Sequence, residues 1–118
     1  MQNSGTVKIW IGSITQQELF YDYILNIINA DGNYLPSDFQ KDWGIEEFDL
    51  KLWKSIWKEQ KKPIHILLKN MPHWASFKEQ VDYGLKGNCA ILIYHPIKKM
   101  YNEVGSIMNF IGEYGYRG

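Results

Sequence analysis

Long apolar runs, paired cysteines and a surplus of either charge are all missing from this 118-residue sequence. No stretch is long and apolar enough for a transmembrane helix, and residues 1–6 are too short and polar for a secretion signal. The single cysteine, Cys89, cannot form an intramolecular disulfide, so we expect a cytoplasmic protein without a membrane partner. Thirteen basic and thirteen acidic residues balance, which argues against nucleic-acid binding, because neutralising phosphates requires a basic excess.

Motifs that carry catalysis or bind metals are also missing. His65, His73 and His95 form neither an HxxxH nor an HExxH pair, and Cys89 has no CxxC partner. On one extended strand, Cys89 and His95 would lie roughly 20 Å apart, too far for a nucleophile and its base. No glycine-rich loop joins a strand to a helix to hold phosphate. We therefore expect a protein that is not an enzyme, with no catalytic residue, no metal and no cofactor.

The composition is that of one globular domain spanning residues 1–118. Apolar residues make up 45% of the chain and charged residues 22%, enough for one core without disulfides. Five tryptophans and eight tyrosines are more than a core of this size needs. Some of these rings should therefore lie at the surface, where aromatic side chains favour binding.

Alternating apolar residues predict three strands. Residues 88–94 are apolar on both alternating faces, which is typical of a strand in the middle of a sheet. Residues 7–12 alternate as a half-covered strand, in which Trp10 either covers the second face of the sheet or is an exposed anchor. A final strand over about 106–112 follows the central strand by a hairpin-length link, so we expect these two strands to pair antiparallel.

Two helices have recognisable starts. Apolar residues at helical spacing predict a helix over about residues 16–28, opened by a capping box between Thr15 and Glu18. A shorter helix is predicted to start at Ser37, with Gln40 completing a capping box, and to end near Gly44.

Further helices are predicted in the middle of the chain. Residues 49–60 combine apolar residues at helical spacing with acids before and lysines after, as the helix dipole favours. A charged partner-binding surface is the alternative explanation of this pattern, since acids dominate residues 31–49 and lysines dominate residues 51–69. Residues 63–68 fit a short helix or a strand, and residues 76–83 fit a helix. Together the elements predict an α+β fold, with a largely antiparallel sheet of about three or four strands packed against amphipathic helices.

Several short motifs occur here in an order that resembles a known family. They are Ile9-Trp10-Ile11-Gly12, the helix with Glu18, Phe20 and Tyr23, Phe39 with Asp42-Trp43-Gly44-Ile45, Ala90-Ile91-Leu92-Ile93-Tyr94, and Phe110-Ile111-Gly112. In this order they resemble the immunity protein 22 family, small α+β proteins encoded beside toxins of bacterial polymorphic toxin systems. The resemblance implies a bacterial cytoplasmic protein that binds a cognate toxin protein and occludes its active or functional surface.

The partner-binding residues are expected on an acidic and aromatic segment. Our hypothesis assigns the contact to Asp38, Asp42, Trp43, Glu46, Glu47 and Asp49. An acidic patch would speed encounter with a basic toxin. A small-molecule or peptide-binding module is the alternative, with Trp53, Trp57 and Trp74 lining a groove. An open strand edge would favour self-pairing through the sheet.

Overall fold

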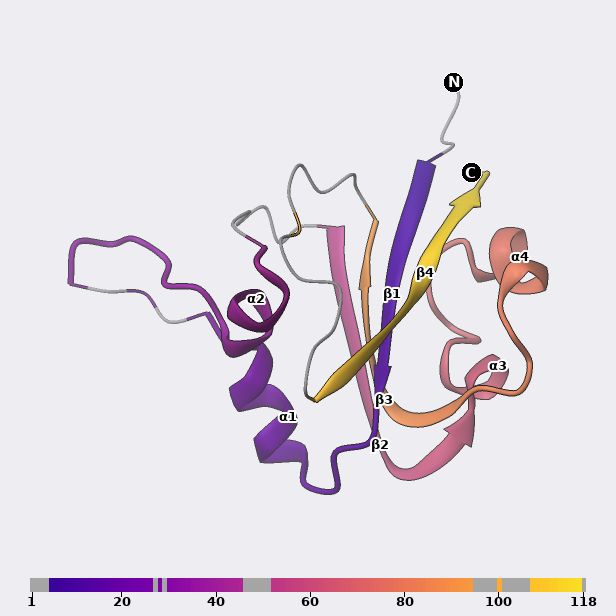
Figure 1. The fold of residues 1–118 in the computed structure, drawn as a ribbon, viewed down its shortest axis with the longest axis horizontal. Coiled ribbons are helices and arrows are strands. Elements are labelled where there is room, and N and C mark those ends of the chain that lie inside the picture. The colour runs from indigo at the N-terminus through magenta and orange to yellow at the C-terminus, as the bar shows by residue number, and fades with distance from the viewer. Residues whose placement is uncertain are drawn as a thin grey trace.

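Four antiparallel strands form an open sheet in the order β2-β3-β1-β4 (Figure 1). The structure is a computed structural model that describes residues 5–26, 28, 30–45, 52–94, 100 and 107–117. The strands are β1 (Gly5–Gly12), β2 (Trp53–Pro63), β3 (Lys86–Ile93) and β4 (Met108–Tyr116). The predicted α+β fold with a largely antiparallel sheet is confirmed.

Short helices cover both faces of this sheet. One face carries α1 (Gln17–Ile24) and α2 (Asp38–Trp43), and the other carries α3 (Ile64–Leu67) and α4 (Trp74–Phe77) (Figure 1). A 3-10 helix, η2 (Lys78–Gln80), directly follows α4. The fold therefore has three layers, with helices outside and the sheet between them.

Strands β3 and β1 occupy the middle of the sheet because their side chains are apolar on both faces. Seven of the eight residues of β3 are buried, which confirms the predicted central strand. The expectation of a half-covered β1 is wrong. Ile9 points to one face and Trp10 to the other, and both are fully buried. The first half of β1 is more exposed, and there Lys8 forms an ion pair with Glu113 of β4.

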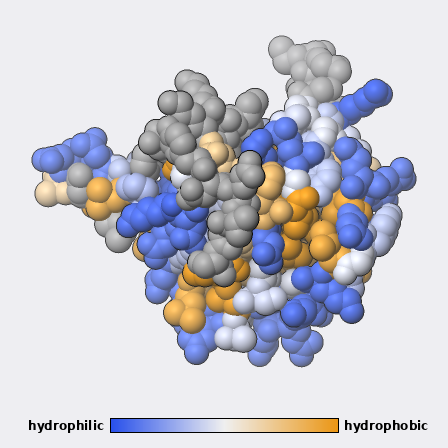
Figure 2. Space-filling view, viewed as in Figure 1, coloured by the Kyte–Doolittle hydropathy of each residue, from blue (hydrophilic) through white to orange (hydrophobic). Residues whose placement is uncertain are grey.

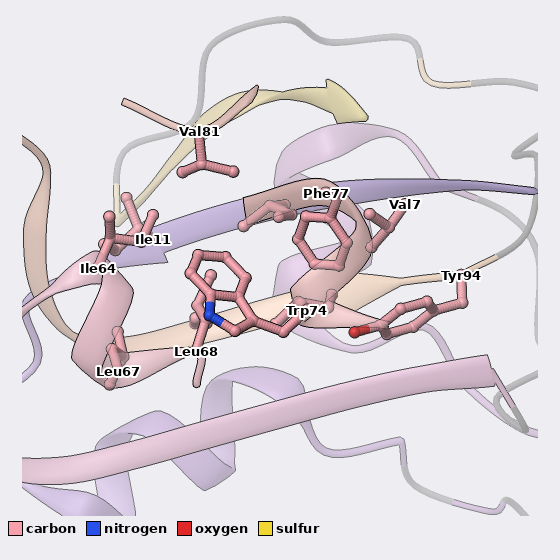
Figure 3. Packing of buried hydrophobic residues seen from close by; sticks show 12 residues of the cluster. Val7, Ile11, Ile64, Leu67, Leu68, Trp74, Phe77, Val81 and Tyr94 are labelled. Carbon is pink, nitrogen blue, oxygen red and sulfur yellow. The ribbon is translucent and has the colours of Figure 1, made fainter. Parts of the chain in front are cut away.

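Each face of the sheet has its own hydrophobic core. On the α3–α4 face, Trp74 and Phe77 from α4 pack over Val7 and Ile11 of β1 (Figure 3). On the α1–α2 face, the cluster centres on Trp10 and includes the following residues: Phe20, Tyr23, Phe39, Trp43, Ile45, Ile91, Ile93 and Met108. The second cluster holds α1 and α2 against the sheet.

The predicted helix over residues 49–60 is wrong, because residues 53–63 form the edge strand β2. Trp53 and Trp57 are four residues apart, so they share a face in a helix and also in a strand. In the structure both pack against the α1–α2 face core, while Ile56 packs against the other core. Pairing with β3, an interaction distant in sequence, decides between the two periodicities. Residues 49–51 lie outside the described residues.

The predicted pairing of the last strand with the central strand is also wrong. β3 pairs with β1 on one side and β2 on the other, so β4 pairs with the free side of β1. The last strand also extends beyond the predicted end at Gly112, as far as Tyr116. Its register with β1 shifts between Ile9 and Trp10, and Gly112 adopts a φ of 145°, which favours glycine. The strand therefore continues past Gly112 with an irregular register.

Local capping signals gave one correct and one incorrect helix start. The capping box at Ser37 is confirmed, since Ser37 Oγ accepts from the Gln40 amide and Gln40 Oε1 accepts from the Ser37 amide. Gly44 ends this helix in the left-handed conformation, with a φ of 65°. The capping box at Thr15 is wrong, because Gln16 caps α1 without a side-chain hydrogen bond. α1 also ends at Ile24, before the predicted end at Ile28.

Two uncertain segments become short helices. The ambiguous stretch 63–68 contains the helix α3, with Pro63 at its N-cap. The predicted helix 76–83 is replaced by α4 and η2, which end at Gln80. The start of α4 lies directly after His73, a residue with a φ of 62°.

Candidate functional site

The outer side of α1 and α2 carries exposed apolar side chains beside acidic ones. Leu19 and Leu25 are 54% and 55% exposed, because α1 buries only Phe20 and Tyr23. Further exposed apolar residues on other segments are Ile28, Tyr34, Leu35 and Ile107. Figure 2 shows apolar surface over α1 and over part of the segment that joins it to α2. Patches of this kind are typical of protein interaction sites.

Two depressions open on this side, and both are lined by Asp22 and Asp38. The larger has a volume of about 440 Å³ and is also lined by Ser13, Ile14, Thr15, Leu19, Tyr23 and Ile107. The smaller, of about 260 Å³, is also lined by Leu25, Leu35, Pro36 and Lys41. We call the area formed by Leu19, Asp22, Leu25, Leu35, Asp38 and Ile107 the α1–α2 surface. It combines apolar hollows with exposed carboxylates. Such a surface could bind a partner segment in which a basic side chain lies next to an apolar one.

The sequence-predicted acids have different roles in the structure. Asp38 is exposed in the first turn of α2, and its carboxylate lies 3.9 Å from the Lys41 amine. Asp42 is half-buried and accepts a hydrogen bond of 2.7 Å from the Tyr23 hydroxyl. Burial first, and the carboxylate of Asp42 second, raise the pKa of Tyr23 far above its usual value. Asp42 therefore ties α2 to α1 as well as adding negative charge near the surface.

Among the remaining predicted contact residues, only Trp43 lies in the described part of the chain, and it is buried. Trp43 is only 1% exposed and packs edge-on against Trp10, with ring centroids 5.8 Å apart. It belongs to the core, so we remove it from the contact set. Glu46, Glu47 and Asp49 lie outside the described residues.

The exposed residues of this surface that sequence reasoning did not select are Leu19, Asp22, Leu25 and Leu35. Leu19 is one of the apolar residues at helical spacing that predict the helix over residues 16–28, but α1 is only eight residues long and buries two of them, Phe20 and Tyr23. The pairs Leu19-Phe20 and Ile24-Leu25 each place two apolar side chains about 100° apart around a helix, so one member of a pair can lie at the edge of the buried face.

The three tryptophans of the alternative groove do not lie together. Trp53 and Trp57 pack on the α1–α2 face, whereas Trp74 packs on the opposite face of the sheet. The indole Nε1 of Trp57 donates to the Ile14 carbonyl at 2.9 Å, so this ring has a structural contact. A single groove lined by Trp53, Trp57 and Trp74 is therefore excluded.

The histidines in the described part of the chain stack on tyrosines. The ring centroids of His65 and Tyr83 lie 3.6 Å apart, and those of His73 and Tyr116 lie 4.3 Å apart. Within the described residues, no group of three or more His, Cys, Asp or Glu side chains could hold a metal ion. No helix among these residues is long and apolar enough to cross a membrane. His95 lies outside them.

Cys89 is expected to be almost unreactive in the folded protein. The side chain is fully buried, and burial raises the pKa of its thiol to about 11, which suppresses the reactive thiolate. Alkylation by iodoacetamide at pH 8 should therefore be about 1000-fold slower than in urea, because it requires opening of the sheet. Mass spectrometry over time measures this rate. Equal rates with and without urea would contradict the buried position.

Comparisons with known proteins identify the family. Searches of curated proteins and of solved structures found no match. The sequence model of the family described as Immunity protein 22 matches residues 7–117, nearly the whole chain. The predicted resemblance is confirmed: the chain belongs to the Immunity protein 22 family.

Proposed function

We propose that this chain is the cytoplasmic inhibitor of a toxin from a bacterial polymorphic toxin system, and that it acts by covering the toxin's active or functional surface. Membership of an immunity protein family is the observation that carries the proposal. Inhibition of this kind needs binding without turnover.

The α1–α2 surface is the contact area that we propose. A stable interface needs roughly 800 Å² on each partner, with an apolar centre and a polar rim. Leu19, Leu25 and Ile107 supply exposed apolar area, and Asp22 and Asp38 supply charge at the shared border of the two hollows. Glu46, Glu47 and Asp49 extend the acidic segment in sequence. The negative charge would accelerate encounter with a basic toxin surface.

Growth of a bacterial host tests the inhibitor role. The host expresses the C-terminal domain of the protein encoded immediately upstream, with or without this chain. We expect growth to stop with that domain alone and to recover when the chain is present. If a toxic domain is not neutralised although the two proteins are both soluble in the cell, it is not the partner that we propose.

Charge reversal tests the location of the contact. The double variant Asp22→Lys, Asp38→Lys should weaken toxin binding at least about tenfold, mainly through slower association, because it reverses the charge at both hollows. Both side chains are exposed, so the melting temperature should fall only slightly, through the loss of the favourable charge of Asp38 in the first turn of α2. Asp42 is left intact because it anchors Tyr23. Surface plasmon resonance at two salt concentrations measures the association rate.

Glu79→Lys is the matched control for these reversals. Glu79 is exposed in η2, which follows α4 on the other side of the sheet, so its reversal should leave binding unchanged. A separate Glu46→Lys variant extends the test to the acidic segment outside the described residues. Unchanged affinity in the Asp22→Lys, Asp38→Lys variant would place the contact elsewhere on the chain.

A further inference from the structure

The outer edge of β2 lacks a neighbouring strand in the described part of the fold. β2 is the last strand on its side of the sheet and pairs only with β3. It is also the longest strand, with 11 residues. An edge strand presents backbone N–H and C=O groups that a further strand can bind.

Lysines dominate this edge. β2 contains Lys54, Lys58, Lys61 and Lys62 against the single acid Glu59. The sequence suggested that these lysines complement the dipole of a helix. This explanation does not apply, because the segment is a strand. Ile56 packs on the α3–α4 face, so strand alternation places Lys54 and Lys58 on that same side.

This charge distribution selects between possible occupants of the edge. Like charges directly opposite each other destabilise a strand pair, so the lysines disfavour antiparallel pairing with a second copy of β2. Acidic residues opposite Lys54 and Lys58 would stabilise the pair. An acidic extended segment therefore fits the edge better than another copy of this chain.

A small apolar pocket lies beside the same edge. It has a volume of about 150 Å³ and lies between β2 and the α1–α2 layer, lined by Ile24, Asn26, Phe39, Trp53, Lys54, Ser55 and Ile91. An apolar cavity of about this volume can take up a molecule the size of benzene, and thus one phenylalanine or leucine side chain. The indole Nε1 of Trp53, in the pocket wall, is buried without an acceptor among the described residues. The pocket thus has room for an apolar group next to an open strand edge.

We propose that β2 binds an acidic, extended segment of a partner protein as a fifth, antiparallel strand, with one phenylalanine or leucine side chain in the pocket beside Ser55. A residue opposite Ser55 faces the pocket, and residues opposite Lys54 and Lys58 face the lysines. In an antiparallel partner this gives the pattern acid-x-x-apolar-acid, with the apolar residue opposite Ser55. Strand addition of this kind takes affinity from the backbone and specificity from alternate side chains.

Selection from a displayed library of random twelve-residue peptides tests the proposal on the whole chain. The experiment contains no toxin, so its outcome is independent of the proposed inhibitor function. We expect enrichment of peptides with the acid-x-x-apolar-acid pattern, and amide chemical-shift changes centred on residues 53–58. Failure to enrich this pattern, or shifts centred on another surface, would overturn the proposal.

Matched lysine variants make the test specific. The double variant Lys54→Glu, Lys58→Glu should bind the selected peptides at least about tenfold more weakly, whereas Lys69→Glu, Lys78→Glu makes the same charge change at exposed sites outside β2 and should bind normally. Replacing the apolar peptide residue by alanine should also weaken binding at least about tenfold. Equal losses in both lysine variants would show only general charge attraction, and this result would overturn the proposal.

Discussion

Replacing Trp10 with alanine is expected to lower the free energy of unfolding by about 3–5 kcal/mol. Trp10 is fully buried and lies at the centre of the core beneath α1 and α2. Its ring centroid lies 5.0 Å from those of both Phe39 and Phe110. Truncation would leave a cavity between the sheet and α2 that these large rings cannot fill. Urea unfolding followed by far-ultraviolet circular dichroism measures the loss.

Two further variants make the Trp10 prediction specific. Trp10→Phe should cost about 1 kcal/mol, because it keeps an aromatic ring and removes an indole N–H that has no acceptor among the described residues. Leu25→Ala truncates a side chain that is 55% exposed and should change stability by less than about 0.5 kcal/mol. If Trp10→Ala costs no more than Leu25→Ala, the ring is not a core anchor.

Asn88→Ala is expected to cost about 2–4 kcal/mol, although it removes only a small amide. The Asn88 Oδ1 accepts from the Ile14 amide at 2.8 Å, and its Nδ2 donates to the carbonyls of Ile14 and Lys58 at 2.6 and 3.1 Å. Asn88 lies in β3 opposite the interval where the register of β2 shifts, between Trp57 and Lys62. The variant would leave buried backbone groups of two segments without partners. Thermal and urea unfolding measure this effect.

The variant Asn88→Asp separates hydrogen bonding from side-chain size. A carboxylate can still accept from the Ile14 amide, but it places negative charge against the two carbonyl oxygens. Burial and these carbonyls should raise the pKa of the new carboxyl in the folded state, so its penalty should shrink as the pH falls below that pKa. Asn109→Asp, at an exposed position of β4, should show no such pH-dependent difference. A pH-independent penalty at position 88 would argue against the three hydrogen bonds.

Trp10 and Asn88 also connect stability with the proposed function. Trp10 supports α2 from below, and Asn88 holds Ile14, which precedes α1 and lines the larger hollow. Loss of either contact should therefore weaken toxin protection in cells by reducing the folded population. It should not slow association at low temperature, where the folded form dominates. This difference distinguishes them from the exposed acids Asp22 and Asp38.

Local interactions explain which parts of the fold could be predicted from the sequence. Residues 89–93 are apolar at successive positions, which favours burial on both faces, and they lie in β3 near the centre of the sheet. The capping box of Ser37 and Gln40 spans three residues, and its hydrogen bonds form with little help from the rest of the chain. The family also followed from short motifs in their order along the sequence.

Only the tertiary structure decided the elements whose local pattern fits two conformations. Trp53 and Trp57 fit a helix and a strand equally, and pairing with β3 made them a strand. The last strand pairs with β1 because β2 occupies the other side of β3, which no local signal reports. Leu19 and Asp22 form a surface because α1 is short and α2 packs beside it. Sequence alone thus determined the buried centre and the family, whereas contacts between distant segments decided the sheet edges and the surface left open for a partner.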